Sequence, residues 1–293
     1  MKVGFIGLGI MGRPMAKNLI RKGYSLVVNT HKKETLDEFR SLGAETALSG
    51  REVAEKCSVI ITMLPNSPQV REVALGRDGI ADGAHGDLTL IDMSSIDPVE
   101  TKAIAAELGK KGIGMLDCPV SGGEPKAIDG TLSVMAGGDR TLFERYSGLL
   151  SAMASSVVHV GEIGSGNIAK LANQIIVACN IAAMSEALAF AKKAGADPGR
   201  VYSAIRGGLA GSAVLDAKAP MILGRNFRPG FRVELHIKDL TNALNAAHAV
   251  SSPVPLTGEV MEMMETLKAM GLGTEDHSAL VRYYELISGV TVV

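Results

Sequence analysis

The sequence predicts an α/β protein in two parts, a doubly wound sheet followed by an all-α domain. Up to about residue 161, short apolar runs alternate with helical patterns, which is typical of parallel βαβ units. Beyond Gly161 no convincing strand follows, and apolar residues recur at helical spacing over Ile168–Ala194, longer than an ordinary helix. We therefore expect a first domain of residues 1–162 and a second of residues 163–293, with the long helix leading directly out of the first domain.

The strands of the first domain are short apolar runs, and glycines end the first two helices between them. The predicted strands are Lys2–Ile6, Ser25–Val28, Val59–Met63, Leu88–Asp92, Gly114–Asp117, Thr131–Ala136 and Ser156–Val160. The predicted helices are Pro14–Lys22, Glu34–Leu42, Gly50–Lys56 and Pro98–Lys111.

Glycine and proline residues separate the helices of the second domain. After the long helix, the predicted helices are Pro198–Gly207, Ala213–Met221, His236–Val250, Leu256–Met270 and Ser278–Ser288. The most apolar part of the chain, residues 171–191, carries Asn173, Gln174 and Glu186, which favours a buried helix over a membrane span.

Composition narrows the function classes. The 293 residues are 46% hydrophobic and 21% charged, as in soluble globular proteins, and the net charge of −1 gives no sign of a nucleic-acid partner. Cys57, Cys118 and Cys179 are widely spaced and odd in number, which argues against a disulfide framework or a zinc site and favours the reducing cytoplasm. The histidines show no ligand spacing, so no metal is expected, and the glycine-rich N-terminus does not resemble a signal peptide.

Gly7, Gly9 and Gly12 form the pattern G-x-G-x-x-G between the first strand and the first helix. In that context the first glycine permits a tight turn, the second lets the backbone approach a pyrophosphate, and the third allows close packing of helix and strand. The free N–H groups of the helix N-terminus add a site for phosphate. The sequence therefore predicts a Rossmann-type dinucleotide site, whose turn also contains Leu8, Ile10 and Met11. A tight glycine turn that binds nothing is the alternative.

The residues after the second strand bear on the choice of cofactor. Enzymes that use NAD usually place an acid about 20 residues beyond the glycine motif to hold the ribose 2′-hydroxyl. This chain has Asn29, Thr30 and His31 there, followed by two lysines. Small polar and basic residues suit a 2′-phosphate, so we expect NADP(H) to be favoured and NAD(H) to be possible. A solvated loop without cofactor contact is the alternative.

Two later loops follow strands of the same predicted sheet. One contains Met63, Leu64, Pro65 and Asn66, and the other contains Ser94 and Ser95. Ligands of open α/β sheets bind outside the carboxyl ends of the strands, so both loops are expected to face the cofactor. The first loop could instead be only the start of a helix.

The segment Ser121-Gly122-Gly123 follows a predicted strand and is a candidate for binding a small carboxylate. Two adjacent glycines expose backbone amides, and the serine adds a hydroxyl, an arrangement that can form an anion-binding nest. The alternative is a turn whose glycines are needed only for positive φ.

Lys170, Asn173 and Gln174 are spaced i, i+3 and i+4, so they share one face early in the long helix. A lysine flanked by apolar residues can be desolvated, which would lower its pKa and suit it to proton transfer. The alternative is a surface lysine whose aliphatic stem packs against the helix. Lys238 and Asp239, in another predicted helix, could supply a second cation to the cofactor or form an ion pair.

Four stretches in order resemble the motifs of the β-hydroxyacid dehydrogenase family. FIGLGIMGRPMAKNL resembles its cofactor signature, DCPVSGGEPKAIDGTLSVMAGGD its substrate motif, GSGNIAKLANQ its catalytic motif and IKDL its later cofactor motif. The resemblance covers essentially the whole chain. Within the family, stretches such as AIRGGLAGS and LGTEDHSAL most resemble the subgroup that reduces tartronate semialdehyde.

The resemblance implies roles for residues at matching positions. Lys170 would be the catalytic lysine, Ser121, Gly122 and Gly123 would hold the substrate carboxylate, and Asn173 would help to bind the substrate. Ser95 and Lys238 would contact the cofactor, with Lys238 at the nicotinamide end, and Phe231 would help to close that pocket. Many members have a second Asn where this chain has Gln174, and members of the subgroup that use NAD tend to carry Asp near Thr30.

The implied reaction is the reversible reduction of tartronate semialdehyde to D-glycerate, with Lys170 as proton donor. Dehydrogenation of 3-hydroxyisobutyrate and reduction of glyoxylate or succinic semialdehyde are alternatives within the family. The helical half is short for a 6-phosphogluconate dehydrogenase. A non-catalytic dinucleotide sensor is an alternative of another class. The apolar long helix predicts a homodimer or homotetramer formed through the second domain.

Overall fold

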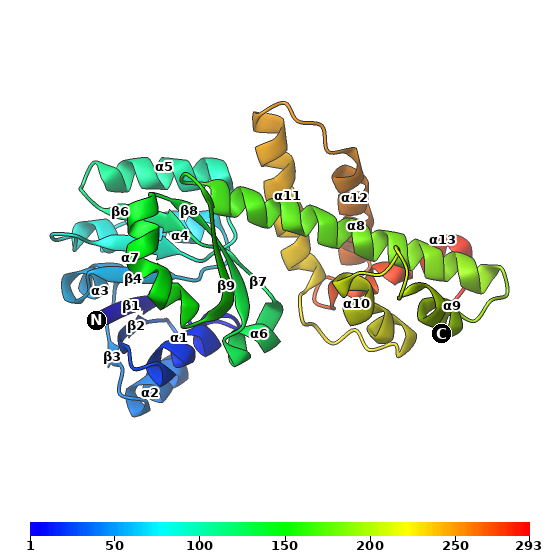
Figure 1. Cartoon of the computed structure of the whole chain (residues 1–293), viewed down its shortest axis with the longest axis horizontal. Coiled ribbons are helices and arrows are strands. Elements are labelled where there is room, and N and C mark those ends of the chain that lie inside the picture. Colours follow the sequence, from blue (N-terminus) through cyan, green and yellow to red (C-terminus); the bar gives the residue numbers. More distant parts are fainter. The chain divides into compact units, whose positions relative to one another are not determined.

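The computed structural model describes residues 1–293, which divide into two compact units, Met1–Lys170 and Leu171–Val293 (Figure 1). The long predicted helix is α8 (Ser165–Lys193), which begins in the first unit and continues through the second. The domain boundary that the sequence predicts, at residue 162, lies just before this helix and stays a prediction.

Unit 1 contains a single sheet of nine strands in the order β3-β2-β1-β4-β5-β6-β8-β7, with β9 beside β8. The strands are β1 (Lys2–Ile6), β2 (Ser25–Asn29), β3 (Glu45–Thr46), β4 (Val59–Thr62), β5 (Thr89–Asp92), β6 (Gly114–Asp117), β7 (Val120–Ser121), β8 (Leu132–Gly138) and β9 (Ala154–Gly161). β1 to β6 are parallel, while β8 runs antiparallel to β6 and β7. All seven predicted strands are present. β3 and β7 have two residues each, too few to give a hydrophobic period.

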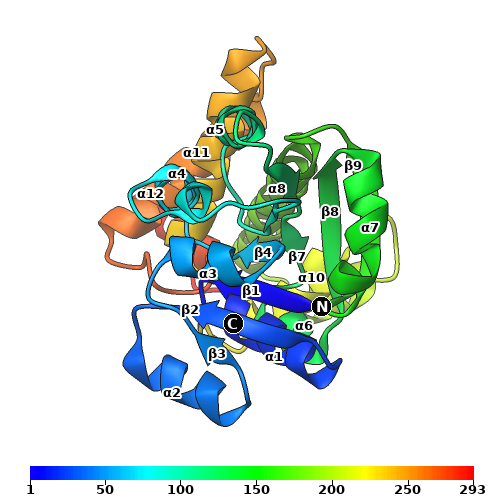
Figure 2. The same ribbon diagram turned by 90° about the vertical axis from the view of Figure 1, so that its left-hand side faces the viewer.

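Helices cover both faces of this sheet. They are α1 (Gly12–Arg21), α2 (Lys33–Ser41), α3 (Gly50–Lys56), α4 (Ser67–Leu75), the 3₁₀ turn η1 (Ile80–Asp82), α5 (Pro98–Gly109), α6 (Gly123–Asp129) and α7 (Arg140–Ser151). Apolar side chains of α1, α2, α6 and α7 form one core with the sheet, and those of α3, α4 and α5 form another. Phe5 and Ile6, neighbours on β1, belong to different cores because successive strand residues point to opposite faces. Figure 2 shows helices on both sides of the strands of unit 1. The first domain is therefore doubly wound, as predicted.

Helices α6 and α7 are absent from the sequence-based prediction, and α4 is present in it only as the alternative interpretation of the loop after β4. For α7 a local signal exists, since the Asp139 carboxylate accepts a hydrogen bond from the Leu142 amide at 2.9 Å, an N-terminal cap. For α6 the signal is weak, because only Ala127 of its seven residues is buried.

Unit 2 is all α-helical, as predicted. After α8 it contains α9 (Pro198–Ile205), α10 (Ala213–Leu223), α11 (Val233–Ala249), α12 (Pro255–Ala269), the 3₁₀ turn η2 (His277–Leu280) and α13 (Val281–Ser288). The only β-type pairing in it is an isolated bridge between Arg232 and Asp276. The last predicted helix is divided into η2 and α13, and the Asp276 carboxylate accepts from the Ser278 amide at the start of η2.

By length and composition alone, α8 could cross a membrane, since its most apolar window has a mean hydropathy of 1.6. Half of that window is nevertheless buried inside the protein. Ile181 and Leu188 of α8 belong to the apolar core of unit 2, together with side chains of α9 to α13. These features agree with the buried helix that the sequence predicts.

Candidate active site

The glycine motif follows β1. The surroundings of its three glycines show why a side chain is or is not tolerated at each position. Gly7 has φ +99°, and a Cβ there would lie 2.3 Å from the carbonyl oxygen of Met63. A Cβ on Gly12 would lie 1.9 Å from the carbonyl oxygen of Gly7. A Cβ on Gly9 would meet no atom within 4 Å. The first and third glycines are therefore required by packing, whereas the second faces open space that a phosphate group can approach.

The other loops of the predicted cofactor site meet the glycine turn at the carboxyl edge of the sheet. The Gly7 amide donates to the carbonyl oxygen of Asn29 at 3.4 Å, and the Met63 amide donates to that of Ile6 at 2.9 Å. The Leu64 amide donates to the Ser94 hydroxyl at 2.9 Å. Ser94 is buried and Ser95 is half-buried. The ends of β1, β2, β4 and β5 thus lie together, as the sequence predicts for these loops.

A cavity of about 660 Å³ adjoins the glycine turn, and it is rich in cations. Leu8, Gly9 and Ile10 form one part of its wall, and the other lining residues are Arg13, Pro14, Lys17, Arg21, Lys32, Glu34, Thr35, Glu124 and Ile128. Arg13 and Lys17 pair with Glu38 at 2.7 and 2.6 Å. Lys32, which is exposed, follows Asn29-Thr30-His31 directly. The cavity therefore presents positive charge near the end of β2.

A buried carboxylate, Asp92, supports the same edge and was not singled out from the sequence. One of its oxygens accepts hydrogen bonds from the Thr62 hydroxyl at 2.8 Å and from the Ser94 hydroxyl at 2.5 Å. The other oxygen has no hydrogen-bond partner. Burial raises the pKa of Asp92 to about 6, and the negative charge of Asp117 adds to the rise. Asp92 therefore holds Ser94 in place next to Ser95.

Ser121 ends β7, and the two glycines after it turn the chain into α6. Gly122 and Gly123 have φ of +134° and +69°, values that residues with a Cβ rarely adopt. A Cβ on Gly122 would also lie 2.7 Å from the Lys126 side chain. The backbone of the turn therefore requires both glycines. This requirement is the one named in the alternative interpretation of the motif, in which the glycines are needed for positive φ.

Two buried side chains fix the first turn of α8, one turn before Lys170. The Asp117 carboxylate accepts from the amides of Gly164 at 2.8 Å and Asn167 at 2.7 Å. The Asn167 side chain accepts from the Ile96 amide at 3.0 Å and donates to the Thr101 hydroxyl at 3.2 Å. Burial raises the pKa of Asp117 to about 6. The sequence offered a weak signal for Asn167, which lies three residues before Lys170 on the same helical face.

Lys170 itself is buried, with 7% of its surface exposed. Gln174 is buried and Asn173 is half-buried. Because α8 is a continuous helix through all three positions, their spacing places them on one face, as the sequence predicts. A buried lysine excludes the surface interpretation of this residue.

In unit 2, Asp239 brings Gln174 and Lys238 together. The Gln174 side-chain amide donates to one oxygen of Asp239 at 2.7 Å, and the Lys238 ammonium pairs with the other at 2.9 Å. Asp239 is 1% exposed. The ion pair was one of two interpretations of Lys238 from the sequence, whereas the link to Gln174 was not foreseen.

Phe231 precedes α11, and its ring lies edge-on to those of His236 and His277, with centroids 5.6 and 5.4 Å away. The predicted site residues thus fall into two sets, one in each unit. Unit 1 holds the glycine turn, Asn29–His31, Met63–Asn66, Ser95, Ser121–Gly123 and Lys170, and unit 2 holds Asn173, Gln174, Phe231 and Lys238. No group of three or more His, Cys, Asp or Glu side chains is placed to hold a metal ion.

A glycine turn at the carboxyl edge of a doubly wound sheet, followed by a helix with a buried lysine, defines a dinucleotide-dependent oxidoreductase. Residues 2–161 match the family model of the NAD binding domain of 6-phosphogluconate dehydrogenase. Residues 164–284 match the model described as NAD-binding of NADP-dependent 3-hydroxyisobutyrate dehydrogenase. The chain belongs to the β-hydroxyacid dehydrogenase family and is an NAD(P)-dependent enzyme.

Curated relatives match over nearly the full chain. The chain is 47% identical over 288 residues to 2-hydroxy-3-oxopropionate reductase of Escherichia coli, covering 98% of both proteins. It is 35% identical to 2-(hydroxymethyl)glutarate dehydrogenase of Eubacterium barkeri, covering 100% of this chain and 97% of the relative. A crystal structure of 3-hydroxyisobutyrate dehydrogenase from Salmonella typhimurium, 30% identical, has a TM-score of 0.85 and covers 96% of this chain and 99% of that one.

Proposed function

We propose that this enzyme reduces tartronate semialdehyde (2-hydroxy-3-oxopropanoate) to D-glycerate, reversibly, with NADPH. The observation that carries the substrate assignment is the 47% identity, over 98% of both chains, to a 2-hydroxy-3-oxopropionate reductase. Curated relatives that are named for other substrates are 33–36% identical. Buried Lys170 supports the chemistry, because a carbonyl that receives a hydride must also receive a proton.

The residues of this chain perform binding, orientation and proton transfer. NADPH supplies the hydride chemistry when it is bound. The Lys170 ammonium donates a proton to the oxygen of the developing alkoxide. The Ser121 hydroxyl and the amides of Gly122 and Gly123 hold the substrate carboxylate, and Asn173 binds the substrate beside Lys170. Holding the carboxylate fixes the distance and angle of the aldehyde carbon, the main way in which a protein speeds such a step.

The residues proposed to contact the cofactor lie at the carboxyl edge of the sheet, and Phe231 and Lys238 are proposed to contact it by resemblance to the family. The full set is Gly7, Leu8, Gly9, Ile10, Met11, Gly12, Asn29, Thr30, His31, Met63, Leu64, Pro65, Asn66, Ser95, Phe231 and Lys238. The open space at Gly9 fits a pyrophosphate. Gln174 takes part in substrate binding through Asp239, which fixes its side-chain amide.

NADPH is proposed over NADH because the end of β2 carries no acid to hold a free ribose 2′-hydroxyl. Thr30 stands near the position of that acid, and Lys32 lines the adjoining cavity with Arg13, Lys17 and Arg21. A phosphate group gains charge-assisted hydrogen bonds from such cations.

Initial rates with tartronate semialdehyde, measured in parallel with NADH and NADPH, test the reaction. Lys170→Ala should lower kcat by roughly a hundredfold or more, the usual worth of a general acid, and leave NADPH binding nearly unchanged. Lys192→Ala, which removes another lysine of α8, is the matched control and should keep full activity. Turnover retained by Lys170→Ala would reject the proton-transfer role.

Oxidation of 3-hydroxyisobutyrate is the second candidate. The match of residues 164–284 to a 3-hydroxyisobutyrate dehydrogenase model and the similarity to two solved enzymes of that name favour it. A panel of 3-hydroxyisobutyrate, glyoxylate, succinic semialdehyde and tartronate semialdehyde distinguishes the candidates by kcat/KM.

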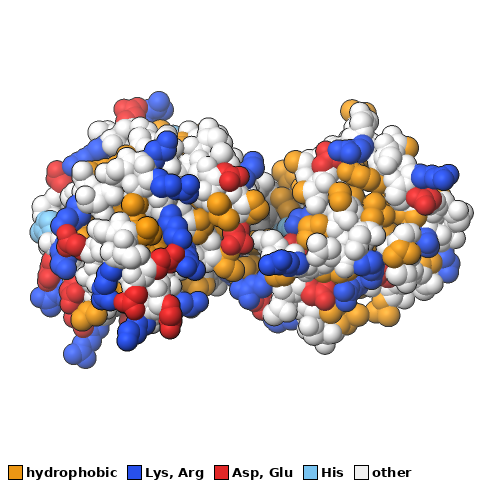
Figure 3. Space-filling view, turned by 90° about the horizontal axis from the view of Figure 1, so that it is seen from below, with side chains coloured by type: hydrophobic (Ala, Val, Ile, Leu, Met, Phe, Trp, Pro, Cys, Tyr) orange, Lys and Arg blue, Asp and Glu red, His pale blue; other side chains and the backbone are white.

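We also propose that the enzyme is a cytoplasmic homodimer or homotetramer assembled through unit 2. Ile176 and Phe190 of α8 are 60% and 72% exposed, and Ala183 between them is exposed as well. These positions recur every seven residues and so lie on one stripe of the helix. Leu286 and Ile287 of α13 are also more than half exposed. Figure 3 shows hydrophobic side chains on the surface of unit 2. An apolar stripe of this kind is stabilised when a second copy covers it.

A further inference from the structure

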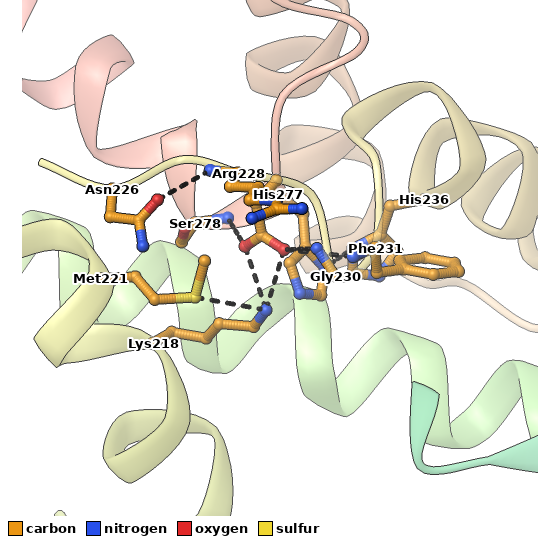
Figure 4. Close-up of polar contacts among 10 residues, drawn as sticks. Lys218, Met221, Asn226, Arg228, Gly230, Phe231, His236, His277 and Ser278 are labelled. Atoms are coloured by element: carbon orange, nitrogen blue, oxygen red, sulfur yellow. Dashed lines mark hydrogen bonds and ion pairs between the residues drawn. The ribbon is translucent and has the colours of Figure 1, made fainter. Parts of the chain in front are cut away.

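A buried carboxylate fixes the backbone that carries Phe231 (Figure 4). Asp276 is fully buried and accepts hydrogen bonds from the amides of Gly230 at 3.0 Å and Phe231 at 3.1 Å. The Lys218 ammonium lies 3.0 Å from both of its oxygens. The positive charges of His277 and Lys218 hold the pKa of Asp276 at about 2, against the effect of burial, which raises it. The main chain at Phe231 is therefore anchored from one side.

Two histidines hold the ring of Phe231 from the other side. The rings of His236 and His277 have their centroids 5.0 Å apart, and Phe231 packs edge-on against both. The His277 amide also donates to the Phe231 carbonyl at 2.9 Å. His236 is 0% and His277 5% exposed, so neither ring can turn freely into solvent.

The hydrogen bonds of the two imidazoles determine where their protons lie. Nε2 of His236 is 3.2 Å from the Gln174 carbonyl oxygen, which can only accept, so this nitrogen carries a hydrogen. Nδ1 of His236 is 2.9 Å from Nδ1 of His277. A neutral His236 then has its lone pair on Nδ1, and Nδ1–H of His277 must be the donor.

Two carboxylates lie close to these histidines in the sequence, and each has a lysine partner. Asp276 is paired with Lys218, and Asp239 is paired with Lys238. Burying an imidazolium costs far more than burying a neutral ring. We therefore infer a neutral His236.

We propose that His236 and His277 are positioning residues that hold Phe231 against α8 at Gln174. The chain of contacts runs from the Phe231 ring through the His277–His236 hydrogen bond to the Gln174 carbonyl, one turn of α8 beyond Lys170. This inference rests on the proposed function, in which Phe231 closes the nicotinamide pocket and Gln174 takes part in substrate binding. The pair is proposed to act through Phe231 and Gln174 and not on the reacting carbonyl itself, so its loss should act on KM more than on kcat.

Two substitutions of His277 separate its hydrogen bond from its bulk. In His277→Asn the side-chain amide can donate from about the place of Nδ1, whereas His277→Phe keeps a ring and removes the donor. We expect His277→Phe to raise KM for the aldehyde about tenfold, because a tenfold change corresponds to the free energy that one buried hydrogen bond contributes. We expect kcat to change less than threefold. His277→Asn should stay within about twofold of the wild type.

Tyr284→Phe is the matched control, because it removes a different buried hydrogen-bond donor of unit 2, the Tyr284 hydroxyl, which donates to the Met263 sulfur. Equal KM values in His277→Phe and the wild type would overturn the proposal. Equal losses in His277→Phe and His277→Asn would also overturn it, since the hydrogen bond would then not be the cause.

Nitrogen-15 NMR of histidine-labelled enzyme tests the pair without any substrate. The expected result is hydrogen on Nε2 of His236 and on Nδ1 of His277. Hydrogen on Nδ1 of His236 would overturn the proposal even if no His277 variant folds. If the wild type fails to turn over tartronate semialdehyde, the proposed function fails. Two measurements then still test whether the pair positions Phe231. They are the tautomers of His236 and His277 in the wild type and the NADPH dissociation constants of the His277 variants.

Discussion

Asp92 and Asp117 are register partners at the ends of the neighbouring strands β5 and β6, and both are fully buried. Their hydrogen bonds differ. Only one oxygen of Asp92 accepts hydrogen bonds, whereas both oxygens of Asp117 accept from amides at the start of α8. The same substitution should therefore have opposite effects at the two positions.

Asp92→Asn should stabilise the protein at pH 7.5 by roughly 1–3 kcal/mol, because the amide oxygen keeps the bonds from Thr62 and Ser94 while the buried charge is removed. The pKa of Asp92 is raised from 3.8 to about 6, so the folded state binds this proton more tightly than the unfolded state. That contribution to stability is full below about pH 4 and is lost as the pH rises through about 6. Urea unfolding at pH 5 and 7.5 measures the difference, and a gain that is larger at pH 5 would contradict the assignment.

Asp117→Asn also removes a buried charge, but its NH2 group would face the amide of Gly164 or Asn167 and leave two buried donors without an acceptor. The substitution should therefore destabilise the protein, by roughly 1–3 kcal/mol at pH 7.5. The first turn of α8 would loosen, so kcat should fall while the dissociation constant for NADPH changes little. Urea unfolding and single-turnover rates provide the two measurements. If kcat is unaffected although stability falls, Asp117 supports the fold without placing Lys170.

Gly9→Ala and Gly12→Ala should separate cofactor binding from stability. A Cβ at position 9 meets nothing within 4 Å, so Gly9→Ala should keep the melting temperature but weaken NADPH binding by about tenfold or more. A Cβ at position 12 would lie 1.9 Å from the Gly7 carbonyl oxygen, so Gly12→Ala should cost roughly 1–3 kcal/mol of stability. Thermal unfolding and NADPH fluorescence titration measure these effects. Unchanged NADPH affinity in Gly9→Ala would place the pyrophosphate elsewhere.

Thr30→Asp should reverse the proposed cofactor preference. A carboxylate at this position repels the 2′-phosphate and offers an acceptor to a free ribose hydroxyl. We expect kcat/KM for NADPH to fall about a hundredfold and that for NADH to be maintained or to rise. Thr30→Asn, which has similar size without the charge, is the control. If the wild type already has a higher kcat/KM with NADH than with NADPH, the proposed preference for NADPH is wrong.

Phe190→Glu should dissociate the proposed oligomer. Phe190 is 72% exposed on α8, and a charge there would have to be buried when a second copy covers the stripe. Light scattering after size exclusion should then report a smaller species than the wild type. Arg77→Glu changes an exposed residue of unit 1, outside the proposed interface, and should leave the mass unchanged. A monomeric wild type would show that the stripe is left uncovered.

Most of the fold of unit 1 could be predicted because its signals are local. Alternating apolar runs and helical patterns gave all seven longer strands, and the glycines of the first turn stand within six residues of one another. The helices α6 and α7 were missed, and α4 was considered only as an alternative. Of these, α6 buries only one residue, so it leaves little hydrophobic periodicity in the sequence.

The sequence by itself determined the glycine turn, the division into an α/β part and a helical part, and the shared face of Lys170, Asn173 and Gln174. Each of these follows from the spacing of residues close together in the sequence. Within one strand or helix, that spacing directly determines which side chains share a face. The tertiary structure alone decided that Asp117 fixes the start of α8 and that Asp239 holds Gln174, partners 50 and 65 residues apart. It alone paired His236 with His277. Such contacts depend on how whole elements pack, because no local period relates residues so distant in the chain.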